Sequence, residues 1–146
     1  MDFFVYGTLT NPEQVAQVVD SYSYLGAAVL DGLHPVSGRY PTLAPGGSVG
    51  GRVLRTDDVD AVDTYEGVGQ GLYVRVEVPW RVDGNDGGDG DATAGDDGVG
   101  ETVAVYVGDP DELDAEEEIS WPGDGSLAER VRRYVARESV TVSWTD

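Results

Sequence analysis

The chain has 146 residues, with 28 acidic and 9 basic side chains, one His and no Cys, which gives a formal net charge of −19. Its length favours a single domain, and its composition excludes disulfides, thiolate metal sites and a cysteine nucleophile. A charge this negative disfavours contact with nucleic-acid phosphates or an anionic membrane, so we expect neither among its partners.

The first elements expected along the chain are a buried strand and a short helix. Residues 2–6 (DFFVY) form an apolar run typical of a buried strand, and residues 7–10 follow as a turn. Asn11 is suited to an N-cap and Pro12 to the first helical position, so a helix is expected there. Beyond the helix we expect extended stretches at about 24–36 and 49–55, joined by a Gly/Pro-rich connection at 40–48.

The middle of the chain predicts a helix and two strands on either side of an acidic segment. Residues 56–67 carry acids in their first turn and end in Gly67, which is typical of a short helix. Apolar and polar residues alternate over 72–82 and again over 101–107, so two paired strands are predicted. Between them, residues 83–100 have Asp or Gly at 13 of 18 positions, which indicates a disordered or mobile hairpin loop.

The C-terminal part predicts one more helix and a last strand. After an acidic connection at 109–118, the run from Ser126 to Glu129 has the spacing of a capping box. The helix that it opens carries four of the nine Arg residues, and 140–144 is expected to be a strand. No repeat or linker divides the chain, so we expect one small α+β or barrel-like domain over residues 1–146.

Three short motifs occur in order along the chain. YGTL at 6–9 follows the first strand, VDTYEG at 62–67 ends the acidic helix, and YVRV at 73–76 lies on the next strand. Together, and over about residues 2–107, they resemble the gamma-glutamylcyclotransferase-like family, in its AIG2-like and gamma-glutamylamine cyclotransferase branch. The resemblance implies an α+β fold, a small mixed β-barrel with flanking short helices.

The resemblance also implies a reaction. A γ-glutamyl amide would be cleaved by attack of its own α-amine on its γ-carbonyl, releasing 5-oxoproline and a free amine or amino acid. The partner would be a small-molecule γ-glutamyl substrate, with no cofactor and no metal. Carried over onto this sequence, the catalytic residue is Glu66, and the substrate-binding residues are Tyr6, Gly7, Thr8, Leu9 and Tyr73.

The composition is compatible with that chemistry. Closing a five-membered ring from within the substrate needs neither an enzyme nucleophile nor a metal, and good orientation contributes up to roughly 7–11 kcal/mol. One carboxylate can take the proton from the α-ammonium and give it to the departing nitrogen. Glu66, at the negative end of a helix, is expected to have a slightly raised pKa and to be a better base.

Each of these residues also has an ordinary structural interpretation. Glu66 could be a solvated helix-end residue, and Tyr6 a core aromatic whose hydroxyl finds one partner. Tyr73 could lie on the strand surface, with Arg75 in a cross-strand ion pair. Tyr106 could reach the pocket or pack in the core. The alternative function is therefore a non-catalytic binding or regulatory module that retains the γ-glutamyl pocket.

The acidic residues are spread from Asp2 to Asp146, and every basic residue is Arg. A partner for a basic ligand would concentrate its acids in one patch, whereas an even spread without Lys favours adaptation to concentrated salt. At ~1 M salt the electrostatic screening length falls to about 3 Å, which removes most of the self-repulsion. The sequence has neither a long apolar run nor a basic leader segment, so we expect a halophilic, cytoplasmic protein.

This salt hypothesis predicts that the fold is more stable in molar KCl than in dilute buffer, because screening weakens the repulsion among the acids. Thermal unfolding followed by circular dichroism in the two solvents measures the difference. Equal melting temperatures would contradict the hypothesis.

Overall fold

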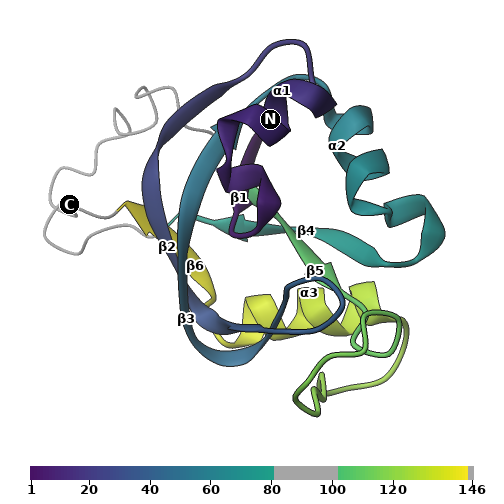
Figure 1. The fold of residues 1–146 in the computed structure, drawn as a ribbon. Helices are drawn as coiled ribbons and strands as arrows, with labels where there is room; N and C mark the ends of the chain where they lie inside the picture. The colour runs from purple at the N-terminus through teal and green to yellow at the C-terminus, as the bar shows by residue number, and fades with distance from the viewer. Residues whose placement is uncertain (81–101, 145–146) are drawn as a thin grey trace, which may run out of the picture.

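Six strands form one mixed sheet that curls into a half-barrel (Figure 1). The computed structural model describes residues 1–80 and 102–144, so the loop predicted at 83–100 lies outside the described residues. The strands, in sheet order, are β4 (Tyr73–Pro79), β5 (Thr102–Gly108), β1 (Asp2–Val5), β3 (Thr42–Arg55), β2 (Ser23–Val36) and β6 (Thr141–Trp144). β1 and β5 run parallel, and the other neighbours are antiparallel. A bridge between Trp80 and Val142 brings the two ends of the sheet together.

The central strand β1 is buried on both faces, as its unbroken apolar run predicted. Phe4 belongs to a hydrophobic cluster with Trp121 and residues of α3 (Leu127–Arg137). Phe3 and Val5 belong to a second cluster with residues of α1 (Pro12–Val18) and α2 (Val59–Glu66). Successive side chains of a strand point to opposite faces, so β1 contributes to both clusters at once.

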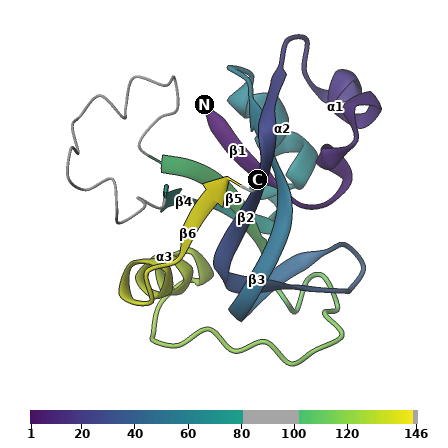
Figure 2. The same ribbon diagram turned by 90° about the vertical axis from the view of Figure 1, so that its left-hand side faces the viewer.

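The helices pack on opposite faces of the sheet at β1. α1 and α2 lie near each other on one side of the molecule, and α3 lies on the other (Figures 1 and 2). Both predicted helix starts are confirmed: Asn11 Oδ1 accepts a hydrogen bond from the Glu13 N–H at 2.8 Å, and Ser126 and Glu129 form a complete capping box. No helix in residues 1–80 and 102–144 is long and apolar enough to span a membrane.

The connection predicted at 40–48 was wrong for most of its length, because β3 begins at Thr42. Pro45 lies inside the strand and pairs with Leu33 of β2, next to a bulge in the register. Gly46 follows with φ +99°, a backbone conformation that glycine tolerates best. The Gly and Pro residues therefore mark an irregular stretch of a long hairpin rather than a loop between strands.

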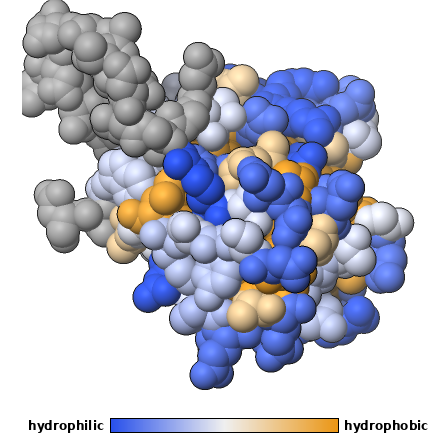
Figure 3. Space-filling view, turned by 90° about the horizontal axis from the view of Figure 1, so that it is seen from above, coloured by the Kyte–Doolittle hydropathy of each residue, from blue (hydrophilic) through white to orange (hydrophobic). Residues whose placement is uncertain are grey.

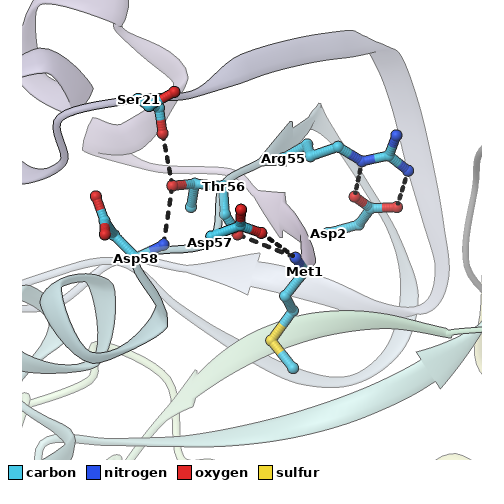
Figure 4. Close-up of polar contacts among 7 residues, drawn as sticks. All are labelled: Met1, Asp2, Ser21, Arg55, Thr56, Asp57 and Asp58. Atoms are coloured by element: carbon cyan, nitrogen blue, oxygen red, sulfur yellow. Dashed lines mark hydrogen bonds and ion pairs between the residues drawn. The ribbon is translucent and has the colours of Figure 1, made fainter.

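A cluster of polar contacts, which we call the Thr56 cluster, holds the chain where β3 turns into α2 (Figure 4). Thr56 is buried, and its hydroxyl donates to the Ser21 carbonyl at 2.7 Å and accepts from the Asp58 N–H at 3.2 Å. Beside it, the Arg55 guanidinium donates two hydrogen bonds, of 2.7 and 3.0 Å, to the buried carboxylate of Asp2. These contacts fix the backbone at which α2 begins.

The face of the molecule that lies above α1 and α2 is largely hydrophilic, with hydrophobic residues visible only in small separate areas (Figure 3). Large apolar side chains that are exposed in the described residues include Tyr40 and Tyr65. Both of these tyrosines line the pocket described next.

Candidate active site

A pocket of about 410 Å³ lies where the loop after β1, the C-terminal end of α2 and the start of β4 meet. This volume suits a small molecule. Of the residues predicted for the site, Tyr6, Gly7, Leu9, Glu66 and Tyr73 line the pocket, and Thr8 begins the short 3-10 turn η1 (Thr8–Thr10) in the same loop. The remaining lining residues are Phe4, Val5, Tyr40, Pro41, Thr64, Tyr65, Gly67, Gln70, Leu72 and Tyr106.

Glu66 is the last residue of α2, and the backbone around it is closely determined. Gly67 follows with φ +78°, and a Cβ there would lie 2.7 Å from Leu72 Cδ1, so glycine is required. The N–H of Gly67 donates to the Thr64 carbonyl, and the N–H of Leu72 donates to the Gly67 carbonyl, both at 3.1 Å. The helix therefore ends at Glu66 with its side chain facing the pocket.

The Glu66 side chain is half-buried in the pocket wall, which withdraws its carboxylate partly from water. Within the described ranges, no group donates a hydrogen bond to it and no cation pairs with it. Burial raises its pKa from 4.5 to about 7, because a desolvated carboxylate favours its neutral form. The sequence predicted a slight rise from the helix dipole; the rise is larger, and its cause is burial.

Two tyrosine hydroxyls beside Glu66 point their protons away to the backbone. Tyr6 donates to the Tyr106 carbonyl at 2.6 Å, and Tyr73 donates to the Pro41 carbonyl at 2.5 Å. Burial is the main cause that raises the pKa of each, and the nearby charge of Glu66 adds to it. Both therefore stay neutral, and each presents oxygen lone pairs to its surroundings. Tyr73 is only 6% exposed, which rules out the surface position considered for it.

The loop after β1 is held by hydrogen bonds to its own backbone carbonyls. The Thr10 N–H and hydroxyl both donate to the Gly7 carbonyl, at 3.1 and 2.7 Å. Leu9 is buried, and its carbonyl accepts from the Tyr24 hydroxyl at 2.6 Å. None of the described groups accepts a hydrogen bond from the Gly7 N–H, so this donor is available to a ligand.

Asp63 and Arg75 were not predicted for the site, and Tyr106, for which the sequence left both the pocket and the core open, lines the pocket. Asp63 of α2 accepts hydrogen bonds from Arg75 Nη1, at 2.9 and 2.8 Å, and from the Tyr106 hydroxyl, at 2.6 Å. The Arg75 ion pair thus runs to the helix and not across the strands. Asp63 and Arg75 stand inside the VDTYEG and YVRV motifs, which is the pattern that points to them.

The described residues contain no group of three or more His, Cys, Asp or Glu side chains placed to hold a metal ion. The model of the family described as gamma-glutamyl cyclotransferase, AIG2-like, matches residues 3–123. The chain belongs to this family. No curated protein matches it in sequence.

Solved structures share the fold of this AIG2-like chain. One described as gamma-glutamyl cyclotransferase is 17% identical, with a TM-score of 0.55, over 92% of this chain and 97% of that chain. An uncharacterized protein from Homo sapiens is 18% identical, with a TM-score of 0.56, over 91% and 96%. A protein from Arabidopsis thaliana is 25% identical, with a TM-score of 0.52, over 94% and 84%. The predicted α+β fold is confirmed.

The raised pKa of Glu66 predicts how stability of the AIG2-like fold depends on pH. The folded state holds the Glu66 proton up to about pH 7 and the unfolded chain only up to about 4.5, so this stabilisation is complete below pH 4.5 and lost as pH rises through 7. Its size is on the order of 2–3 kcal/mol. Glu66→Gln lacks the loss, so it gains stability relative to wild type between pH 5 and pH 8.

Urea unfolding of both proteins in molar KCl, at several pH values, measures this difference. Glu112→Gln is the matched control, because Glu112 is an exposed glutamate outside the pocket. A wild type and a Glu66→Gln variant with the same pH dependence would contradict the assignment.

Proposed function

We propose that the chain is a γ-glutamyl cyclotransferase, which converts a γ-glutamyl amide into 5-oxoproline and a free amine. The observation that carries this proposal is Glu66, a carboxylate with a pKa of about 7 that faces a pocket and has no hydrogen bond or cation partner among the described residues. A carboxylate held in this way costs stability at neutral pH, which is typical of a group kept for proton transfer. Membership of the AIG2-like family supports the same reaction class.

In the proposed mechanism Glu66 carries protons from the attacking nitrogen to the leaving nitrogen. Its carboxylate takes a proton from the substrate α-ammonium, and the freed amine attacks the γ-carbonyl carbon to close the five-membered ring. The protonated Glu66 gives this proton to the leaving nitrogen as the carbon–nitrogen bond of the amide breaks, and its carboxylate then takes the second proton from the ring nitrogen and passes it to the released amine, which departs as an ammonium. A pKa near 7 suits Glu66 both as the base that takes a proton and as the acid that gives one, because an effective acid–base catalyst has a pKa close to the working pH.

The remaining pocket residues supply the binding groups that the substrate requires. Tyr6 and Tyr73 donate their protons to the backbone, so their oxygens are free to accept from the α-ammonium. The backbone N–H groups of the Gly7–Leu9 loop are proposed to bind the α-carboxylate or the developing oxyanion. Each of the predicted residues thereby has a role, with Thr8 acting through its backbone.

The charges around the pocket favour an amine over an amino acid as the leaving group. Among residues 1–80 and 102–144, no Arg, Lys or His lines the pocket, and the whole chain carries a net charge of −19. A leaving group with a second carboxylate therefore meets Glu66 and no cation, which is electrostatically unfavourable. The sequence left this choice open.

This preference is testable with two substrates that differ only in the carboxylate, γ-glutamyl-isobutylamide and γ-glutamylvaline. We expect kcat/KM to be at least about tenfold higher for γ-glutamyl-isobutylamide than for γ-glutamylvaline, which corresponds to ~1.4 kcal/mol. The ratio of the two kcat/KM values is expected to fall as KCl is raised, because salt screens the repulsion. Release of 5-oxoproline at two KCl concentrations measures it. Equal rates, or faster turnover of γ-glutamylvaline, would contradict the preference.

The catalytic role of Glu66 predicts that Glu66→Gln loses about 10²–10⁴-fold in kcat, because glutamine cannot transfer the proton. For the wild type, kcat/KM is expected to rise with pH through about 7, as Glu66 ionises. Release of 5-oxoproline in molar KCl is the measurement, with Glu112→Gln as the control. Full activity of Glu66→Gln would overturn the role, and a wild type that binds γ-glutamyl amides without turnover would favour the non-catalytic module.

We also propose, from the sequence pattern, that the protein works in the cytoplasm at high salt. The even spread of acids and the complete use of Arg in place of Lys support the second point.

A further inference from the structure

Asp63 stands three residues before Glu66 on α2, so the two carboxylates lie on the same side of the helix, one turn apart. Their surroundings differ. Asp63 accepts from Arg75 through both oxygens and from the Tyr106 hydroxyl, whereas no described residue donates to Glu66. Asp63 is therefore held by hydrogen bonds, and Glu66 has none from the described residues.

The two partners of Asp63 come from a single place in the sheet. Arg75 of β4 and Tyr106 of β5 are directly opposite each other in the antiparallel register. Tyr106 is itself fixed, because its ring stacks on Phe3 of β1 at 5.9 Å and its carbonyl accepts the Tyr6 hydroxyl at 2.6 Å. The Asp63 contacts thus attach α2 to β4 and β5, the strands that carry Tyr73 and Tyr106 of the pocket lining.

Burial of side chains contributes little to holding the described helix α2. The helix has eight residues, of which only Val62 is buried, and its N-cap residue Asp58 makes no side-chain cap. The Thr56 cluster fixes the beginning of the helix but lies more than two turns before Glu66 (Figure 4). Val62, the turn at Gly67 and the Asp63 contacts are therefore among the contacts that hold the end of the helix.

We propose that Asp63 is a positioning residue: with Arg75 and Tyr106 it fixes the last turn of α2, and so holds the Glu66 carboxylate in place against the reacting nitrogen. This inference rests on the proposed function for its effect on rate. Its structural part, that Asp63 holds Glu66 in its buried place, stands on the contacts alone.

The groups that face Glu66 determine what a loosened helix would do. They are the phenols of Tyr6 from the β1 loop, Tyr73 from β4 and Tyr106 from β5, whose raised pKa values keep them neutral near pH 7. Tyr40 and, on the same helix, Tyr65 also line the pocket. With no cation beside it, Glu66 owes its raised pKa to burial. If the last turn of α2 moves, Glu66 gains water and its pKa falls towards 4.5.

The test compares Asp63→Asn and Tyr106→Phe with wild type. We expect Asp63→Asn to lower kcat by about 10–100-fold with a smaller change in KM, because a displacement of about 1 Å is enough to cost that much. For Asp63→Asn, the rise of kcat/KM with pH is expected to occur below pH 7, where the wild-type value rises. Tyr106→Phe keeps the ring and removes one bond to Asp63, so we expect a smaller change in the same direction.

Asp60→Asn is the matched control. Asp60 is an exposed acid of the same helix, one turn before Asp63 and outside the pocket that holds Glu66. It is expected to leave kcat and the pH profile unchanged. Rates are corrected for the folded fraction, so a loss that is equal at every pH, with the rise of kcat/KM at its wild-type pH, counts against positioning.

A second readout does not need turnover. The side-chain carboxyl carbon of Glu66, assigned through its absence in Glu66→Gln, is titrated by NMR in each variant. If wild type shows no 5-oxoproline release but Asp63→Asn lowers the Glu66 pKa, the proposed function fails and the positioning by Asp63 stands. If neither Asp63→Asn nor Tyr106→Phe moves the pKa or the corrected rate, the inference is overturned. Should Asp63→Asn not fold, the Tyr106→Phe result decides.

Discussion

The site depends on how the Glu66 carboxylate is held in a half-buried position where none of the described residues offers it a cation. A carboxylate is more stable in water, and no hydrogen bond from the described residues keeps Glu66 in the pocket. Its position must therefore come from the backbone that carries it. The left-handed turn at Gly67 stops the helix at that residue, and the Asp63 contacts bind the helix to the sheet. A rigid frame replaces the missing contacts of the side chain.

The same physical view separates the acids of the chain by what surrounds them. Asp2 and Asp63 are each matched by an arginine, so their charges are neutralised within the fold. Many others are exposed and remain in solvent. Glu66 belongs to neither group, because it is desolvated and unmatched. Glu66 therefore differs from the other acids in its surroundings, and neither the composition nor the net charge of the chain indicates this difference.

Much of the fold could be predicted from local patterns. Alternation located β4 and β5, capping residues located α1 and α3, and the apolar run of residues 2–6 located the central strand. The start of β3 was missed, because Pro45 and Gly46 are turn formers whose place in a long hairpin is decided by the partner strand. Local propensity yields to tertiary pairing at such positions.

For the site, the motifs located the loop after β1 and the end of α2, where the pocket is found. They did not reveal the contacts of Asp63 with Arg75 and Tyr106, since these depend on how the helix lies over the sheet. Strand register placed Arg75 opposite Tyr106, but the sequence does not say which helix residue meets that pair. The origin of the raised pKa of Glu66 was likewise beyond reach, because burial is a property of the folded chain.

The parallel pairing of β1 with β5 has a consequence for how the protein folds. The bond from the Tyr6 hydroxyl to the Tyr106 carbonyl joins residues 100 positions apart, so closing it restricts a long stretch of chain. The β2–β3 hairpin, by contrast, pairs strands that are adjacent in the sequence, so closing it restricts less chain. We therefore expect the pocket to be completed late in folding, when β5 docks. Until then β1 keeps an open edge, which makes the docking of β5 the step most exposed to mispairing.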